Sequence, residues 1–339
     1  MISAQSSRPP SSARSARSSA GSRSSTARSR ASTTSPLSFA SRTLQKVGSS
    51  PPHRPRPCGR SGTVDSPHDP RPRAKDCLVT TTEALAAAAR RLRAAGCVFA
   101  EEEAAVLSEA AEHDSGALAV LVERRAAGEP LEQVTGYADF CGVRVRLRPG
   151  VFVPRVRSGL LVRLGAEAAP PDGLVVDLCC GSGALGLAVR HRVPGIALHA
   201  ADIDPVAVAC ARENLGENVY LGDLFEALPA ALRGRVDVLL ANVPYVATRH
   251  IDLLPAEARE HEPRTALDGG DDGLAVFRAV AAGAAEWLAP RGVLLSEITE
   301  AQAETAREIA AGNGLTATIT TDDDLDSLAI IVRKPLQRP

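Results

Sequence analysis

Short apolar segments alternate with helical patterns over the second half of the chain, from residue 174 towards the C-terminus. Each apolar run has the length of a buried strand, and the residues between several of them recur at helical spacing. The predicted strands are Leu174–Leu178, Ala197–Ala201, Val219–Leu221, Val236–Leu240, Gly292–Ile298, Leu315–Ile319 and Ser327–Val332, with predicted helices at Gly183–Arg190 and Pro205–Leu215. This alternation is typical of a mostly parallel sheet covered on both faces, so we expect a doubly wound α/β domain.

A different pattern precedes this domain. Apolar residues recur at helical spacing from Leu85 to a stop at Gly96, and further helical patterns cover 101–112 and 117–127. The residues that next alternate with polar ones, and so predict a β-hairpin, are Phe140, Val143, Val145 and Leu147. We therefore expect a small helical domain at residues 79–135, a hairpin linker at 136–160 and the α/β domain at 161–339. The helical domain is either a packing cap or a substrate-recruiting unit.

Charge is divided unevenly along the chain, although the formal net charge is only −1. The first 75 residues hold 14 Lys and Arg against two acids, whereas the remaining 264 residues hold 25 bases and 38 acids. Residues 1–78 are rich in Ser, Arg and Pro and have little apolar surface to bury, so we expect them to be disordered. Three interpretations stay open: an organellar transit peptide, an arm that attracts nucleic acid, or, the one we favour, a segment foreign to the natural protein.

Composition argues against several classes of protein. Aromatic residues make up 3% of the chain, which disfavours base stacking as the main activity. No apolar run approaches the roughly 18 residues of a membrane span. The seven cysteines are odd in number and form no CxxC pair, which disfavours a disulfide framework and a metal site. We expect a soluble, monomeric, cytoplasmic protein without a metal, and the acidic folded part disfavours nucleic acid as a partner.

The first candidate site lies directly after the strand predicted at 174–178. Gly181 and Gly183 stand between this strand and the next helix, where glycines let a ligand approach the backbone and the helix start offers N–H groups. Together with Gly186 they match the G-x-G-x-x-G spacing of dinucleotide-binding folds, although small residues are common in such turns. Asp177 lies four residues before Gly181, where it would repel a pyrophosphate but suit an ammonium group.

Two further acids follow the next two strands. Asp202 ends the second strand, where a carboxylate can bind both ribose hydroxyls, and Asp223 could reach the exocyclic amine of adenine. An ammonium group at one end and an adenosine at the other describe S-adenosylmethionine better than NAD. The predicted cofactor-binding residues are Asp177, Cys179, Gly181, Gly183, Asp202, Asp223, Leu224 and Asn242.

The second candidate site is the segment Asn242-Val243-Pro244-Tyr245, which follows the fourth apolar run. The nitrogen of an amide or aromatic amine is a poor nucleophile because its lone pair is delocalised. An Asn side-chain oxygen and the Val243 carbonyl could grip such an NH₂ group, aim it at a methyl group and stabilise the charge that grows on nitrogen. We expect Pro244 to bias Val243 towards extended geometry and the Tyr245 ring to pack on the planar substrate. The same four residues are also ordinary turn chemistry.

These residues carry a family resemblance. Asn242–Tyr245 resembles the Asn-Pro-Pro-Tyr motif of methyltransferases that modify planar amino groups, and the surrounding sequence resembles the HemK/PrmC family of protein N5-glutamine methyltransferases. The segments that carry this second resemblance are Gly128–Leu131 with Gly136, Gly150–Arg155 and Glu262–Leu267. The resemblance covers about Thr80 to the C-terminus and implies a Rossmann-like methyltransferase domain. It also implies methyl transfer from S-adenosylmethionine to a glutamine side chain, in the best-known members that of the Gly-Gly-Gln tip of class I peptide-chain release factors.

The chain departs from the family pattern at several positions. Cys179 replaces the first glycine of the binding loop, and Val243 replaces the first proline of the catalytic motif. After Pro154-Arg155 the family continues Pro-Glu-Thr-Glu, whereas residues 156–159 read Val-Arg-Ser-Gly, so two expected carboxylates are missing. These changes leave the reaction type standing and put the protein substrate in question. The alternatives are an adenine-N6 methyltransferase of nucleic acid, or a cofactor-binding module that has lost catalysis.

Two other residues draw attention. Trp287 lies among alanines in a helical pattern, and we expect it in the core. Glu297 ends a predicted strand and either lines the pocket or is structural. The sequence shows no evident general base, and amide methylation does not need a strong one, since the proton can leave after transfer.

Overall fold

A computed structural model describes residues 74–335, with side chains from residue 82 onwards, and the expectations for residues 1–73 lie outside this range. The first helix, α1 (Ala74–Ala94), begins earlier than the domain boundary predicted at residue 79. No proline follows Pro72 in this stretch, so the backbone can remain helical through residues expected to be disordered. None of the described helices is long and apolar enough to cross a membrane.

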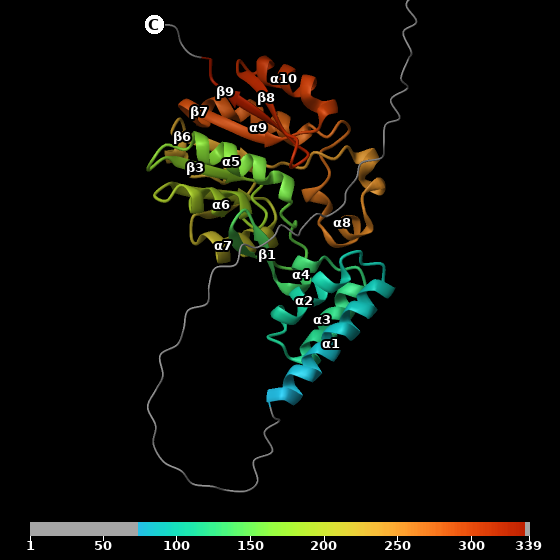
Figure 1. Ribbon diagram of the computed structural model, residues 1–339. Coiled ribbons are helices and arrows are strands. Elements are labelled where there is room, and N and C mark those ends of the chain that lie inside the picture. Colours follow the sequence, from blue (N-terminus) through green and yellow to red (C-terminus); the bar gives the residue numbers. More distant parts are fainter. Residues whose placement is uncertain (1–73, 336–339) are drawn as a thin grey trace, which may run out of the picture. The chain divides into compact units, whose positions relative to one another are not determined.

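A small helical bundle opens the described chain (Figure 1). Helix α1 is followed by α2 (Ala100–Ala110), α3 (Ser115–Ala126) and α4 (Leu131–Thr135). The Asp114 carboxylate accepts the Ala117 N–H at 2.7 Å, which satisfies one of the free donors at the start of α3. Leu92, Leu107 and Leu118 belong to the hydrophobic core of this bundle.

The predicted hairpin is confirmed as strands β1 (Tyr137–Phe140) and β2 (Val143–Arg146), which pair antiparallel. Phe140 and Val145 are buried against the α/β domain, whereas Asp139 and Arg144 face outwards. The alternating pattern thus reflects one buried face of a two-stranded sheet.

The α/β domain contains a seven-stranded sheet in the order β5-β4-β3-β6-β7-β9-β8. Its strands are β3 (Leu174–Leu178), β4 (Ala197–Asp202), β5 (Val219–Leu221), β6 (Val236–Ala241), β7 (Leu288–Glu297), β8 (Thr316–Asp322) and β9 (Ser327–Arg333). The first five are parallel, and β9 pairs antiparallel with both of its neighbours. All seven predicted strands are present, although β7 begins four residues earlier than predicted, at Leu288.

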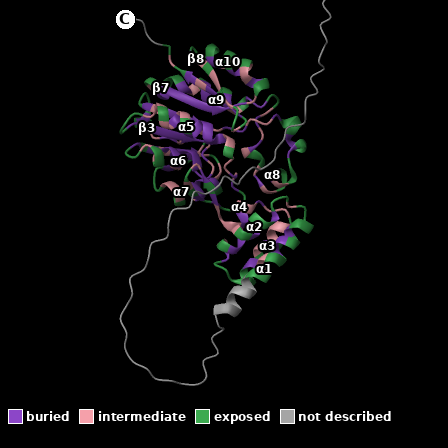
Figure 2. Cartoon of the chain, in the orientation of Figure 1, coloured by how far each residue is buried: buried purple, intermediate pink, exposed green. Residues whose placement is uncertain are grey.

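Helices cover both faces of this sheet, as expected for a doubly wound fold. The α-helices after the hairpin are α5 (Gly159–Ala168), α6 (Ala184–Arg192), α7 (Pro205–Leu215), α8 (Ala256–His261), α9 (Ala275–Trp287) and α10 (Ala303–Gly312), with 3-10 turns at Val156–Ser158, Leu224–Ala227, Ala230–Leu232, Thr248–Leu253, Arg264–Ala266 and Glu300–Gln302. One hydrophobic cluster joins α9 and α10 to the sheet, and another joins α5 and α6 to the opposite face. Buried residues follow the strands, while exposed residues lie on the outer sides of the helices (Figure 2).

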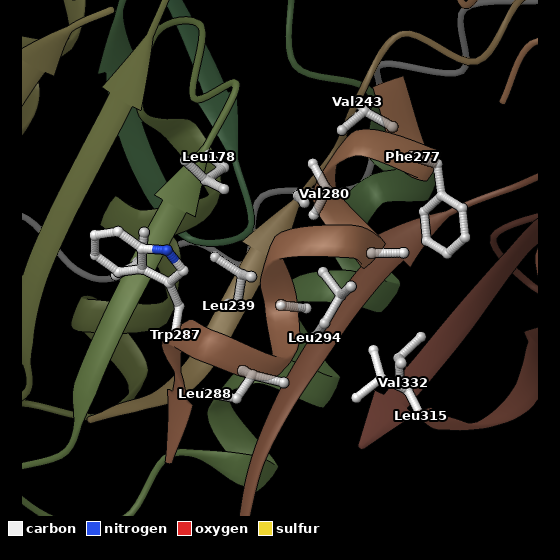
Figure 3. Packing of buried hydrophobic residues seen from close by; sticks show 14 of the residues in the cluster. Leu178, Leu239, Val243, Phe277, Val280, Trp287, Leu288, Leu294, Leu315 and Val332 are labelled. Carbon is white, nitrogen blue, oxygen red and sulfur yellow. The ribbon is translucent and has the colours of Figure 1, made fainter. Parts of the chain in front are cut away.

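Trp287 is core, as predicted. It is 2% exposed, stacks on Phe225 with ring centroids 5.4 Å apart, and lies beside Leu239 and Leu288 (Figure 3).

The parallel strands β3 to β7 all end at the same edge of the sheet, and the order of the strands changes direction between β3 and β6. Open α/β sheets bind their ligands at such an edge.

Candidate active site

The glycine turn between β3 and α6 is shaped by left-handed backbone. Gly181 and Gly183 have φ of +55° and +76°. A Cβ on Gly183 would overlap Leu215 of α7, so this position requires glycine for both conformation and packing. A Cβ on Gly181 would meet nothing within 4 Å, so the turn is open on that side and a ligand could approach its backbone.

Cys179 also adopts a left-handed conformation, with φ of +55°. This is the region where glycine is favoured, which accounts for the glycine that the resemblance led us to expect here. Burial raises the pKa of both the Cys179 and the Cys180 thiols, so neither is a ready thiolate. Among residues 82–335 no group of His, Cys, Asp or Glu side chains has the arrangement of a metal site.

Asp177 lies beneath this turn and is 1% exposed. Its Oδ2 accepts the Gly186 N–H at 2.9 Å, whereas its Oδ1 is buried and has no hydrogen-bond donor among the described residues. Burial raises the pKa of this carboxyl to about 7, and the nearby Asp202 adds to the rise. An unpaired buried carboxylate oxygen is costly, and a ligand cation is one way to compensate it.

Asp202 and Asp223 are brought to the same sheet edge by neighbouring strands. The Asp202 carboxylate accepts the Gly181 N–H at 2.8 Å and the Asp204 N–H at 2.9 Å, which ties the end of β4 to the glycine turn. Each carboxylate oxygen can accept a further hydrogen bond. Asp223 is exposed just past β5 and precedes Leu224, whose φ is +43°. No sequence pattern indicates Ile203, which is 60% exposed directly after Asp202 and offers an apolar surface at this edge.

Asn242 follows β6 at the same edge. Its Nδ2 donates to Ser158 Oγ at 3.2 Å, whereas its Oδ1 is buried without a donor among the described residues. Val243 is buried in the core cluster, so its side chain points away from solvent. Pro244 is buried as well, and Tyr245 is half-buried.

The Tyr245 hydroxyl belongs to a polar cluster that the sequence did not reveal. It donates to Glu297 Oε1 at 2.8 Å and accepts a hydrogen bond from Arg157. Arg157 Nε donates to the same carboxylate oxygen at 2.7 Å, and Ser158 Oγ donates to Glu297 Oε2 at 2.7 Å. Burial and the Glu297 carboxylate raise the pKa of the Tyr245 hydroxyl, which therefore stays protonated. Within this cluster the sequence indicates Glu297 by its position at a strand end, whereas no sequence pattern indicates Ser158.

Several contacts hold the segment Asn242–Tyr245 in place. Gln302 Nε2 donates to the Tyr245 carbonyl at 2.9 Å, and Ser296 Oγ donates to the Ala241 carbonyl at 2.7 Å. Gly273 lies so close that a Cβ there would overlap the Tyr245 carbonyl. Backbone held this tightly presents its side chains in one geometry, which is what an active site needs.

A second set of contacts ties the linker to the segment that follows β6. The buried Glu262 carboxylate accepts the Val153 N–H at 3.1 Å and pairs with Arg155 at 2.6 Å. Gln133 of α4 donates to the carbonyls of Val151 and His261. Three of the segments that carry the resemblance, residues 128–136, 150–155 and 262–267, therefore meet at or near these contacts.

Comparison with known proteins agrees with this architecture. A family model described as the methyltransferase small domain matches residues 143–271. A release factor glutamine methyltransferase of Moorella thermoacetica is 35% identical over 259 residues, covering 70% of this chain and 91% of the relative. A 4-amino-L-phenylalanine/4-methylamino-L-phenylalanine methyltransferase of Streptomyces pristinaespiralis is 38% identical over 190 residues, covering 52% of this chain and 63% of that protein.

Among solved structures, the chain is similar to a release-factor-specific protein-(glutamine-N5) methyltransferase from Alicyclobacillus acidocaldarius. The identity is 23% and the TM-score 0.35, over 54% of this chain and 95% of the other. The fold and the matching family model define a methyltransferase, whose methyl donor is S-adenosylmethionine. Within that class, the chain belongs to the release factor glutamine methyltransferase family.

Proposed function

We propose that the protein transfers a methyl group from S-adenosylmethionine to the side-chain amide nitrogen of a glutamine in a peptide-chain release factor. One observation carries this proposal: Asn242 Oδ1 is a buried acceptor without a donor among the described residues. Native proteins rarely leave such an atom unsatisfied, and those that do often hold it for a ligand. A glutamine amide supplies the missing N–H.

The residues at the glycine turn fit the cofactor. The open side of Gly181 leaves room for a ligand, and the unpaired Asp177 Oδ1 can accept from its ammonium group. We propose that Asp202 accepts from the ribose hydroxyls and that Asp223 and Leu224 meet the adenine, with Ile203 as an apolar surface. Cys179 and Gly183 shape the backbone of the turn. When bound, S-adenosylmethionine supplies an electrophilic methyl carbon on a positively charged sulfur.

The catalytic segment would act on the amide by orientation and charge stabilisation. Asn242 Oδ1 accepts one amide N–H and the Val243 carbonyl accepts the other, which fixes the plane of the amide and directs its nitrogen. Both oxygens also stabilise the positive charge that develops on nitrogen as the new bond forms. Pro244 and the tethered Tyr245 hold this backbone in place. The proton leaves to solvent after transfer, so no strong base is needed.

We also propose that the division at 79–135, 136–160 and 161–339 describes functional units. Glu262, Arg155 and Gln133 join the linker to the methyltransferase domain and to α4. These contacts give the helical unit a fixed position from which it could meet a protein substrate.

A second candidate function is methylation of a small aromatic amine. It is favoured by the 38% identity with the aminophenylalanine enzyme and by the chemistry of the site, which suits any planar NH₂ group. The adenine-N6 alternative is less well supported, because the folded part of the chain is acidic and repels polyanions.

The test offers the purified protein and labelled S-adenosylmethionine a release factor, the same factor with its Gly-Gly-Gln glutamine replaced by alanine, 4-amino-L-phenylalanine, DNA and RNA. We expect label on the intact release factor alone. Label on the aromatic amine alone would favour the second candidate, and label on nucleic acid would contradict both.

A further inference from the structure

The direction in which the Asn242 amide points decides whether it can bind a substrate NH₂ group. With Oδ1 towards the substrate, the residue accepts an N–H. If the amide were turned over, its own NH₂ would face the substrate NH₂, and two donors would meet. In the structure Asn242 Nδ2 donates to Ser158 Oγ at 3.2 Å, and Asn242 Oδ1 points away from Ser158.

The hydrogen bonds beyond Asn242 fix this direction. An ionised carboxylate only accepts hydrogen bonds. Oε1 of Glu297 is taken by Arg157 and Tyr245, and Oε2 accepts the Ser158 hydroxyl at 2.7 Å. Because Ser158 has a single hydroxyl hydrogen, its oxygen can only accept from Asn242, which must therefore present Nδ2.

We infer that Ser158 and Glu297 are positioning residues that set the orientation of the Asn242 amide. Glu297 is 3% exposed and Ser158 is 2% exposed, so water does not readily substitute for either partner. The two residues touch no reacting atom. Ser158 acts on Asn242 directly, and Glu297 acts on it through Ser158 and also accepts the Tyr245 hydroxyl. This inference rests on the proposed function, in which Asn242 Oδ1 is the acceptor for the substrate amide.

Glu297→Gln keeps the shape of the side chain but reverses the direction of the hydrogen bonds that run from residue 297 through Ser158 to Asn242. The new side-chain oxygen would stay with Arg157 and Tyr245, so the new NH₂ group would face Ser158. Ser158 would then accept from that group and donate its own hydrogen to Asn242. Asn242 would turn over to present Oδ1 to Ser158, and its NH₂ group would face the substrate.

Methyl transfer by four variants tests this reasoning, with Ser327→Ala as the matched control. Ser327 is a buried serine whose Oγ lacks a hydrogen-bond partner among the described residues, and it lies on β9. We expect Glu297→Gln to lower kcat about 100-fold, as loss of one oriented group in a charge-stabilising site does. Ser158→Ala frees the amide to adopt either direction and should lower kcat less than about tenfold. Ser158→Thr keeps the hydroxyl and should retain activity.

The double variant Ser158→Ala/Glu297→Gln is decisive. Without the Ser158 hydroxyl, the amide introduced by Glu297→Gln cannot drive the Asn242 amide over, so the double variant should be more active than Glu297→Gln alone. The double variant would then lose less kcat than the two single changes added together predict, so the two changes would be strongly non-additive. Two independent structural defects would instead make the double variant the worst of the four. The KM for S-adenosylmethionine should not change in any of them.

A spectroscopic readout is independent of activity. The chain has only four asparagines, at 214, 218, 242 and 313, so selective ¹⁵N-Asn labelling gives four side-chain NH₂ pairs. The Asn242 pair, assigned by its loss in Asn242→Ala, should exchange slowly with solvent in the wild type. In Glu297→Gln it should shift and exchange faster, because the group turns towards the open site.

Each result points one way. Recovery of kcat in the double variant with faster exchange in Glu297→Gln supports the inference. A double variant no better than Glu297→Gln, or an Asn242 pair with the same shift and exchange rate in both proteins, overturns it. If the wild type methylates no glutamine while the Asn242 pair still responds as expected, the proposed function fails and the positioning relation stands.

Discussion

Replacing Asp177 by asparagine should make the free protein more stable at alkaline pH. The Asp177 carboxyl is 1% exposed and has one hydrogen-bonded and one unpaired oxygen. Asparagine has the same shape, can keep the Gly186 hydrogen bond through its oxygen, and removes the buried charge. The change therefore isolates the cost of keeping an ionised group at this site.

The magnitude follows from the pKa of Asp177, which burial raises from 3.8 to about 7. Between these values the folded protein keeps a proton that the unfolded chain has released, so stability falls as pH rises through this range. Well above pH 7 the carboxyl is ionised in both states, and the penalty is then complete and corresponds to roughly 4 kcal/mol. The unpaired NH₂ group of the variant costs about 1–3 kcal/mol. The net gain at pH 8.5 is thus about 1–3 kcal/mol.

Urea unfolding at pH 5 and pH 8.5 measures this effect, with Trp287, the only tryptophan and a buried one, as the fluorescent reporter. The advantage of the variant should shrink by roughly 3 kcal/mol from pH 8.5 to pH 5. Asp252→Asn, on an exposed residue, is the matched control and should change little. In the same variant, S-adenosylmethionine affinity should fall at least tenfold, because the ammonium group loses its carboxylate.

The reasoning would be refuted by a variant that is less stable than wild type at pH 8.5. It would also be refuted by a difference that stays constant with pH, since only a group that titrates between the two conditions gives a changing difference. Burial also raises the pKa of other carboxyls, among them Glu132 and Glu262. They contribute equally to the pH dependence of stability in the wild type and the variant, so their contributions cancel in the comparison.

Three further changes have expected outcomes. Gly273→Ala should lower kcat at least tenfold and lower Tm, because the new Cβ overlaps the Tyr245 carbonyl and φ there is +77°. Asn214→Ala should weaken S-adenosylmethionine binding about tenfold in calorimetry, because Asn214 joins the Ser182 carbonyl of the glycine turn to β2 at 2.9 Å. Arg155→Ala should lower the free energy of unfolding by about 3 kcal/mol in urea, because it leaves Glu262 buried and unpaired.

Each of these changes has a matched control in the chain. Gly314→Ala has a φ of +70° with nothing near its Cβ, so it carries the backbone strain without the overlap. Asn218→Ala removes an exposed asparagine, and Arg307→Ala breaks an exposed ion pair expected to contribute less than about 1 kcal/mol. Equal effects in a variant and its control would contradict the corresponding explanation.

The strands could be predicted closely because their signal is local. β3 and β5 have the predicted bounds, since each is a short, mostly apolar run with a glycine directly beside it. The start of β7 was missed because Pro290 and Arg291 interrupt its pattern, and the register with β6 shifts between Val236 and Val238. The start of α1 was missed because nothing in the sequence of its first turn marks a helix boundary.

The residues of the candidate active site could be predicted only where they lie at strand ends. Asp202 and Asn242 follow apolar runs, and the topology of a parallel sheet brings such positions to one edge. Ser158 lies 84 residues from Asn242 and 139 from Glu297, so no local pattern could reveal their hydrogen bonds. At Arg157 the comparison with the family pattern indicates only a missing carboxylate, whereas in the fold Arg157 is the ion-pair partner of Glu297.

The central claim is that Asn242 presents its oxygen to a glutamine amide for methyl transfer. The most direct measurement incubates wild type and Asn242→Ala with a release factor and S-adenosylmethionine, and maps the methyl group by mass spectrometry. We expect one methyl group on the Gly-Gly-Gln glutamine with wild type and a loss of about 100-fold or more in kcat with the variant, at nearly unchanged cofactor affinity. Equal transfer by the two proteins, or a methyl group on any other residue, would contradict the account.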